Sequence, residues 1–397
     1  MTENEISVYC DKIGLGPMLN WGTYQRRMLK TYGTKYADFS VAVDKRISGV
    51  DIDPYPLKNA SAGLSVAIAS QYFGNYYREL FQWLDSVSTP SIRSILDLGC
   101  ENGIITCFLA TVFPDAKIVG VDRSREAIAV GDQLKERLFR KNVSFVHSDL
   151  DNFLNTSEQK FDLVLTSLVV HEWLRESTIG YMLETPEFWE GQDAVDNYAA
   201  LHTAKLSLVA RTITENGLWV SVDRLPNPAS YAFWIKEINA AGLSIDLSLS
   251  CSVKVSVVSK EDTQEIFPII VAGHKIITPL SWNQVLSLYT AVDFADFLKS
   301  TIEGWHAELF FRSLIVEDVV LEVETTYDNG TERVMVATTP TLAIYYKHST
   351  LGFRRITTAP KVGIWRLAKE ALNICKNQPN ITVRYGSDEA KAILTKI

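Results

Sequence analysis

Apolar and polar positions follow three different patterns along the chain. Between residues 61 and 87, apolar side chains recur at helical spacing behind Ser61, which predicts a long helix with a serine N-cap. From residue 92, short apolar runs alternate with amphipathic segments, and after residue 280 the pattern changes again. The chain is therefore predicted to consist of a helical N-terminal cap (1–90), a central α/β domain (91–278) and a small C-terminal α+β domain (279–397).

The central segment has the pattern of a mostly parallel α/β sheet. Continuous, β-branched-rich runs are typical of strands buried on both faces, and they occur at 94–98, 116–122, 142–149, 161–170 and 217–223. Helices are predicted between them at 102–112, 124–139 and 192–215. Two more strands, 243–259 and 265–275, are joined by a connection too short for a parallel crossover. The result is a predicted seven-stranded sheet whose last strand is antiparallel.

The C-terminal segment has a different pattern. A helix is predicted at 281–300, and apolar and polar residues alternate on both sides of Asn329-Gly330, which predicts a β-hairpin. A further strand is predicted at 341–349 and a helix at 362–377, before a basic tail.

The charge distribution bears on the class of partner. The net charge of −8 argues against nucleic acid, because binding to nucleic acid depends on neutralising phosphates. From Thr341 to Ile397, however, ten Lys and Arg stand against three Asp and Glu, so ten minus three leaves this part near +7. Two interpretations stay open, an ordinary surface with a basic patch and a docking face for an acidic partner.

Cysteine usage and the first residues bear on the compartment. The five cysteines are scattered and form no C-x-x-C pair, which fits a reducing compartment. The first ten residues are polar and acidic rather than signal-like, and no apolar run reaches the ~18 residues that a membrane span needs. We expect a cytoplasmic protein without membrane contact.

The stretch SILDLGCENG, residues 94–103, is a strand-to-loop turn of the kind that opens nucleotide pockets. A phosphate-cradling G-x-x-x-x-G-K-[ST] loop does not occur in the sequence. A dinucleotide loop needs three glycines, but counting from Gly99, Glu101 and Ile104 occupy the second and third positions. The Glu101 carboxylate would also face a doubly charged pyrophosphate. Both observations argue against NAD and FAD.

The same stretch resembles the first motif of the class I S-adenosylmethionine-dependent methyltransferases, D-x-G-x-G-x-G, with Glu101 in place of the middle glycine. Asp122 ends the second strand, where the family's carboxylate accepts hydrogen bonds from the ribose hydroxyls. Asp149 ends the third strand, where the family places a side chain against the adenine amine. FDLVLTS resembles the family's fourth strand, and TENGLWVSVD resembles the turn into its fifth.

The resemblance covers roughly residues 73–275 and implies a Rossmann-like fold that binds S-adenosylmethionine. Cofactor-binding roles are carried over to Asp97, Gly99, Cys100, Glu101, Gly103, Asp122, Arg123, Asp149, Leu150, Ser167 and Leu168.

Catalytic candidates follow the fourth strand, because ligands of open α/β sheets bind beyond the carboxyl ends of the strands. His171 is the candidate general base, since the unperturbed pKa of histidine, near ~6.5, suits proton removal from an acceptor. Glu172 is the second candidate. The alternatives are that His171 caps the following helix and that Glu172 faces solvent.

Aromatic residues are candidates for the acceptor site. Tyr72, Tyr76 and Trp173 are predicted to contact the substrate, and an aromatic-rich insertion at about 173–197 is predicted to cover the pocket. Simple packing is the alternative for all of them. The dispersed histidines give no candidate metal site.

Three interpretations of function stay open. In the first, the protein methylates a small molecule, and the C-terminal domain serves dimerisation, lid closure or contact with a carrier protein. In the second, it methylates a protein or RNA that docks on the basic C-terminal domain. In the third, the fold is a non-catalytic scaffold. The sequence does not identify the acceptor, nor whether oxygen, nitrogen or carbon receives the methyl group.

Overall fold

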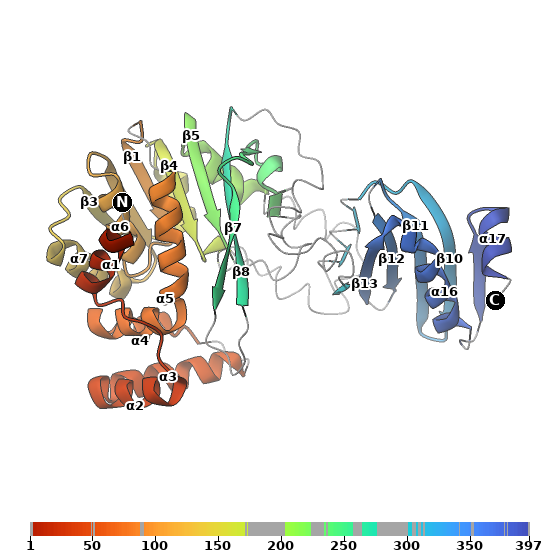
Figure 1. Cartoon of the computed structure of the whole chain (residues 1–397), viewed down its shortest axis with the longest axis horizontal. Helices are drawn as coiled ribbons and strands as arrows, with labels where there is room; N and C mark the ends of the chain where they lie inside the picture. Colours follow the sequence, from red (N-terminus) through yellow and green to blue (C-terminus); the bar gives the residue numbers. More distant parts are fainter. Residues whose placement is uncertain are drawn as a thin grey trace. The chain divides into compact units, whose positions relative to one another are not determined.

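The computed structural model describes most of the chain, which divides into two units (Figure 1). The first unit comprises residues 1–171, 205–224 and 242–278, and the second comprises 172–204, 225–241 and 279–397. The residues described are 3–48, 50, 52–87, 91–170, 173, 203–223, 234–235, 237–256, 264–275, 301–303, 307–308, 311–312, 314–340, 342–350, 353–376, 378 and 380–395. The three-part division of the chain at residues 90 and 278 stays a prediction.

The N-terminal part of the first unit is helical. Its helices are α1 (Glu3–Ile13), α2 (Trp21–Tyr32), α3 (Thr34–Ile47), α4 (Tyr55–Lys58) and α5 (Ala62–Ser86). The predicted serine cap of α5 is confirmed, because the Ser61 hydroxyl accepts a hydrogen bond from the Leu64 amide at 3.4 Å. Leu64 and Ile68 of α5 pack with residues of α2 and α3, whereas Val66 and Tyr76 belong to the core of the α/β sheet. Helix α5 therefore lies between the two layers.

The sheet of the first unit is Rossmann-like, as predicted. Strands β1 (Ser94–Leu98), β2 (Lys117–Asp122), β3 (Val143–His147), β4 (Phe161–Ser167) and β5 (Ile213–Val222) run parallel in the order β3-β2-β1-β4-β5. Strand β8 (Gln264–Gly273) pairs antiparallel with β5. The helices α6 (Ile104–Val112), α7 (Arg125–Arg137) and α8 (Leu150–Thr156) follow β1, β2 and β3.

Two details of this sheet differ from the sequence prediction. Of the predicted strand 243–259, residues 243–256 are described, and they contain two short strands, β6 (Ser244–Ile245) and β7 (Cys251–Ser256), each paired antiparallel with β8. The Asp246 carboxylate accepts hydrogen bonds from the Ser248 and Leu249 amides, and this turn interrupts the strand. The helix predicted to end at Glu215 ends earlier, because Ile213 already pairs with Phe161 as part of β5.

The second unit contains an antiparallel sheet of order β14-β10-β11-β12-β13-β9. Its strands are β9 (Thr301–Glu303), β10 (Asp318–Tyr327), β11 (Gly330–Thr338), β12 (Leu342–Ser349), β13 (Arg354–Pro360) and β14 (Ile381–Tyr385). Tyr327 pairs with Gly330, which confirms the predicted hairpin. Helix α16 (Ile364–Cys375) buries its apolar side against one face of the sheet. Strands β13 and β14 and helix α17 (Asp388–Leu394) were not predicted.

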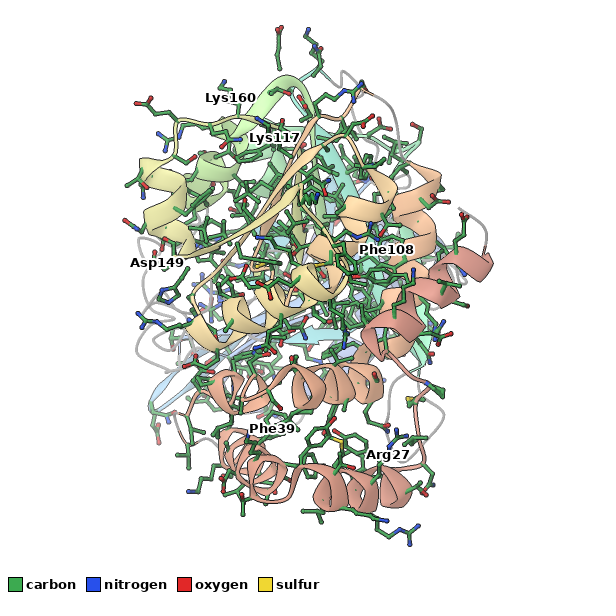
Figure 2. The ribbon with its side chains drawn as sticks, turned by 90° about the vertical axis from the view of Figure 1, so that its left-hand side faces the viewer. Arg27, Phe39, Phe108, Lys117, Asp149 and Lys160 are labelled. Carbon is green, nitrogen blue, oxygen red and sulfur yellow. The ribbon has the colours of Figure 1, made fainter. Side chains whose placement is uncertain are left out.

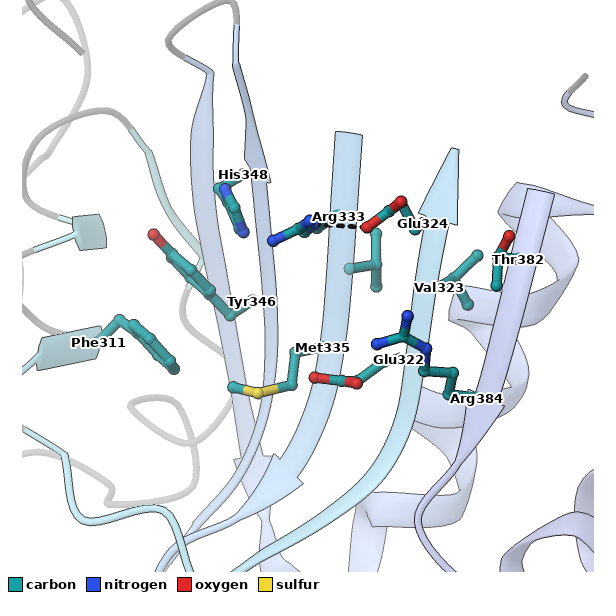
Figure 3. A pocket seen from close by; sticks show the side chains of 11 residues that line it. Phe311, Glu322, Val323, Glu324, Arg333, Met335, Tyr346, His348, Thr382 and Arg384 are labelled. Atoms are coloured by element: carbon teal, nitrogen blue, oxygen red, sulfur yellow. Dashed lines mark hydrogen bonds and ion pairs between the residues drawn. The ribbon is translucent and has the colours of Figure 1, made fainter. Parts of the chain in front are cut away.

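The other face of this sheet carries paired charges and stacked rings around a hollow of about 220 Å³ (Figure 3). Arg333 Nε lies 2.7 Å from Glu324 Oε2, and the rings of Phe311 and Tyr346 stack at 4.0 Å between centroids. Elsewhere in the unit, three basic residues of the C-terminal stretch have carboxylate partners earlier in the chain. These ion pairs are Lys347–Glu332, Arg354–Glu308 and Lys361–Glu317. At least three of the ten basic residues counted in the sequence are thus paired locally with carboxylates.

Candidate functional site

The candidate site lies where the carboxyl ends of the parallel strands face the N-terminal helices. In Figure 2, Lys117 and Lys160, near the amino ends of β2 and β4, lie on the side of the unit away from Arg27 and Phe39 of α2 and α3. The loop after β1, residues 99–103, therefore emerges toward these helices. Ligands of open α/β sheets bind at this edge.

Two glycines allow the loop to pack closely. Gly99 and Gly103 have φ angles of +71° and +75°, in the left-handed region that favours glycine. A Cβ at Gly99 would lie 2.3 Å from Val169 Cγ2, and one at Gly103 would lie 2.6 Å from Phe145 Cζ. The loop after β1 is thus pressed against the loop after β4 and against β3, and neither glycine tolerates a side chain.

Asp122, at the end of β2, holds the loop from the other side. Its Oδ2 accepts a hydrogen bond from the Glu101 amide at 2.9 Å, and its Oδ1 accepts one from the Ser124 amide at 2.8 Å. Burial raises the pKa of this carboxyl, which those two amides oppose. A carboxylate accepts about four hydrogen bonds, so capacity remains for the two hydroxyls of a ribose. Asp122 therefore fits the predicted role.

The side chains of Asp97, in β1, and of Cys100, in the loop, are both directed into the protein interior. The Asp97 side chain is buried, and Thr106 Oγ1 donates a hydrogen bond to its Oδ2 at 2.6 Å. Burial raises the pKa of Asp97 to about 7, although the Thr106 hydrogen bond lowers it. Cys100 is also buried, and its amide donates to the Val121 carbonyl at 3.0 Å. These positions indicate support of the loop, and their contact with a cofactor stays a prediction.

Glu101 has a partner that sequence reasoning missed. Its Oε1 forms an ion pair with the ammonium group of Lys58, the last residue of α4. The two side chains are only 23% and 8% exposed, so the charge of the glutamate is compensated inside the protein. The electrostatic argument against a pyrophosphate is therefore weaker than expected. The remaining argument against a dinucleotide is that Glu101 and Ile104 occupy two of the three glycine positions of its loop.

A second polar connection joins the loop to α5. Asn102 Nδ2 donates to Ser65 Oγ at 2.9 Å, and Ser65 Oγ donates to Asn59 Oδ1 at 2.6 Å. All three side chains are buried. The sequence could not have indicated the contact between Asn102 and Ser65, because only the packing of α5 against the loop brings the two side chains together.

The end of β4 contributes Ser167 and Leu168. Ser167 Oγ and the Tyr76 hydroxyl are 2.7 Å apart in a hydrogen bond, and Tyr76 is almost fully buried. Leu168 has a φ of +56°, and its amide donates to the Val222 carbonyl at 2.8 Å. Glu101 and Leu168 are thus two non-glycine residues in the left-handed region at one sheet edge. Such strain concentrates at functional sites.

The remaining cofactor candidates lie after β2 and β3. Asp149 is exposed and caps α8, since its Oδ1 accepts from the Asn152 amide at 2.7 Å. Leu150, the first residue of α8, is buried, and Arg123 is exposed at the end of β2. Their roles toward an adenine or ribose stay predictions.

Within the described part of the chain, the structure does not bring the remaining substrate and catalytic candidates together at this edge of the sheet. The Tyr72 ring packs against Trp21 and Tyr24 of α2, with centroids 6.1 and 6.3 Å away, so it belongs to the helical layer. Trp173 is 6% exposed and is assigned to the second unit. His171, Glu172 and the rest of the predicted insertion, 174–197, lie outside the described residues.

Comparison with known proteins identifies the domain that contains the loop after β1. Residues 91–225 match a family model described as a methyltransferase domain. These residues form an S-adenosylmethionine-dependent methyltransferase domain. The match includes the loop, Asp122 and the end of β4, and the cofactor of this domain class is S-adenosylmethionine. Within the described residues, no three His, Cys, Asp or Glu side chains are grouped so as to hold a metal ion, and no helix is long and apolar enough to span a bilayer.

Relatives with curated names have different acceptors. The chain is 31% identical over 90 residues to "Ribosomal RNA small subunit methyltransferase C" of Buchnera aphidicola subsp. Baizongia pistaciae (strain Bp), covering 22% of this chain and 27% of that protein. It is 32% identical over 90 residues to "Trans-aconitate 2-methyltransferase" of Acidovorax sp. (strain JS42), covering 23% and 33%. It is 35% identical over 89 residues to "Malonyl-[acyl-carrier protein] O-methyltransferase" of Bacillus anthracis, covering 22% and 30%. The chain thus matches about a third or less of each relative's length.

Proposed function

We propose that this protein transfers the methyl group of S-adenosylmethionine to a small-molecule acceptor, with His171 as the general base. The observation that carries the proposal is the convergence of the 99–103 loop, Asp122 and the Ser167–Leu168 turn at one edge of the methyltransferase domain.

The residues at this edge have distinct tasks toward the cofactor. When bound, S-adenosylmethionine supplies an electrophilic methyl group carried on a sulfonium. Gly99 and Gly103 let the loop pack against Val169 and Phe145 and so keep the shape that receives the ligand. The Asp122 carboxylate accepts hydrogen bonds from the ribose hydroxyls. Asp149 and Leu150 lie at the end of the neighbouring strand, where an adenine would be held. Ser167 and Leu168 border the reacting centre.

The acceptor side depends mainly on positioning. Methyl transfer is a displacement in line with the breaking bond, so the protein gains most by holding the acceptor atom in that line. His171, which follows β4 in the sequence, removes the proton from the acceptor oxygen, nitrogen or acidic carbon. Glu172 is the alternative group for this task.

Two observations favour a small acceptor over a docked nucleic acid. The net charge is −8, and basic residues of the C-terminal stretch such as Lys347 and Lys361 are paired with carboxylates of the same unit. Compensated charges of this kind attract a polyanion weakly. The names of the relatives include both kinds of acceptor, so they do not favour either.

The experiment is a methylation assay with isotopically labelled S-adenosylmethionine. The protein is incubated separately with small-molecule extract, total RNA and denatured protein, and the label is followed in each fraction. Label in the small-molecule fraction, lost in the Asp122→Ala variant, supports the proposal. Label found only in RNA or protein would show that the acceptor is a macromolecule and would contradict the proposal. Cofactor binding without transfer to any fraction would favour the scaffold interpretation.

A further inference from the structure

The cofactor loop is held by helices that lie outside the matched domain. The family model covers residues 91–225, whereas the loop's ion-pair and side-chain partners, Lys58 and Ser65, come from α4 and α5. Both contacts are side chain to side chain, and both join the first unit's helical layer to the edge where the cofactor is expected.

The Lys58–Glu101 pair forms the first contact. Glu101 has a φ of +45°, a conformation that costs stability for any residue with a Cβ. Glycine would remove that cost, yet the position holds a glutamate whose carboxylate is paired with a lysine that is 8% exposed. A buried charge is tolerated only with a partner, so each side chain requires the other in place. The ion pair with Lys58 therefore stabilises the strained backbone conformation at Glu101.

The second contact is the chain of side chains from Asn102 through Ser65 to Asn59. Asn102 also accepts a hydrogen bond from the Ile104 amide at 3.3 Å, at the first residue of α6. The buried Asn59 donates in turn to the Tyr55 carbonyl at 3.1 Å within α4. The start of α6 is thus connected through buried polar groups to the same short helix that carries Lys58.

From these contacts we infer that Lys58 and Ser65 are positioning residues for the cofactor loop. They hold residues 99–103 in the shape that accepts S-adenosylmethionine, and they make cofactor affinity depend on the N-terminal helices as well as on the methyltransferase domain. Neither residue touches the reacting atoms. The inference concerns the site of the proposed function and rests on it for the identity of the ligand.

The test is a double-mutant cycle on the full chain, read as the dissociation constant of S-adenosylhomocysteine by calorimetry. Lys58→Met and Glu101→Gln should each weaken binding by about tenfold or more, and the double variant should be no weaker than either single variant. Independent effects would instead multiply to about a hundredfold. Lys58→Arg, which keeps the charge, should bind within about threefold of wild type.

A second readout does not need the ligand. Amide hydrogen exchange at residues 100–104 should be about tenfold faster or more in Lys58→Met, because the loop loses its anchor. The matched control is Lys275→Met, which removes an exposed lysine paired with Glu215 at the other end of the sheet and should leave exchange in the loop unchanged.

The outcomes separate the inference from the proposed function. If Lys58→Met only lowers the melting temperature, while ligand affinity and loop exchange stay at wild-type values, the positioning role is wrong. If wild-type protein binds neither S-adenosylmethionine nor S-adenosylhomocysteine, the proposed function fails. The exchange experiment then still decides whether the helices hold the loop.

Discussion

The raised pKa of the Asp97 carboxyl leads us to predict an unusual pH dependence of the free energy of unfolding. Burial raises its pKa in the folded protein to about 7, whereas an unfolded chain gives aspartate about 3.9. The folded state therefore keeps a proton at pH 5 that the unfolded state has lost. Stability contributed by this group falls as the pH rises toward 7 and is constant above it.

The size of the effect follows from the two pKa values. Linkage gives a loss of about 2.5 kcal/mol in the free energy of unfolding between pH 5 and pH 8 from this one group. Asp97→Asn removes the titration but leaves an oxygen to accept from Thr106. The difference in unfolding free energy, variant minus wild type, should thus become more positive by that amount between pH 5 and pH 8.

Urea unfolding of both proteins at pH 5, 6.5 and 8, with the slope m compared at each pH, measures this difference. Asp162→Asn is the control. Although partial burial opposes it, the Arg93 and Ser94 amides hold the pKa of the Asp162 carboxyl below its usual value. Its stabilising contribution is lost only as the pH falls through the acid range, so the control difference should be flat from pH 5 to 8. A flat difference for Asp97→Asn as well would refute the reasoning.

Two further predictions concern the site itself. His171→Ala should lower turnover by about a hundredfold or more, since that is the low end for general acid–base catalysis, with little change in cofactor affinity. Steady-state kinetics and calorimetry check this, and an unaltered rate would remove His171 from the mechanism. Gly103→Ala should destabilise the protein by about 2–4 kcal/mol, because its Cβ meets Phe145 Cζ at 2.6 Å and φ is +75°. Chemical unfolding should show part of that loss recovered in Gly103→Ala combined with Phe145→Leu, and no recovery would contradict the clash.

The sequence predicted the sheet and the loop because both depend on local patterns. Each local feature can be recognised from a few neighbouring residues. Examples are the apolar run of β1, the glycines at 99 and 103 and the carboxylate of Asp122. The cap of α5 by Ser61 was predictable for the same reason. The hairpin between β10 and β11 followed from alternation around Asn329-Gly330.

The missed features depend on contacts between distant segments. Lys58 and Glu101 are 43 positions apart in the sequence, and only the position of α4 in the fold brings them together. The same holds for the basic stretch, where Arg354 pairs with Glu308 and Lys361 with Glu317. Counting charges along the sequence predicts a basic tail, and pairing across the fold compensates part of that charge. Strand β14 was missed although its apolar residues alternate with polar ones, because the segment after residue 377 was interpreted as a basic tail; Val383 and Tyr385 pack against the core beside α16.

The most direct test of the account is calorimetric titration of the full chain with S-adenosylmethionine and S-adenosylhomocysteine, beside the Asp122→Ala variant. The account predicts micromolar binding of both ligands to the wild-type protein and loss of that binding in the variant, which lacks the ribose acceptor and the hydrogen bond that holds the Glu101 amide. Absence of binding to the wild-type protein, or equal binding to Asp122→Ala, would contradict it.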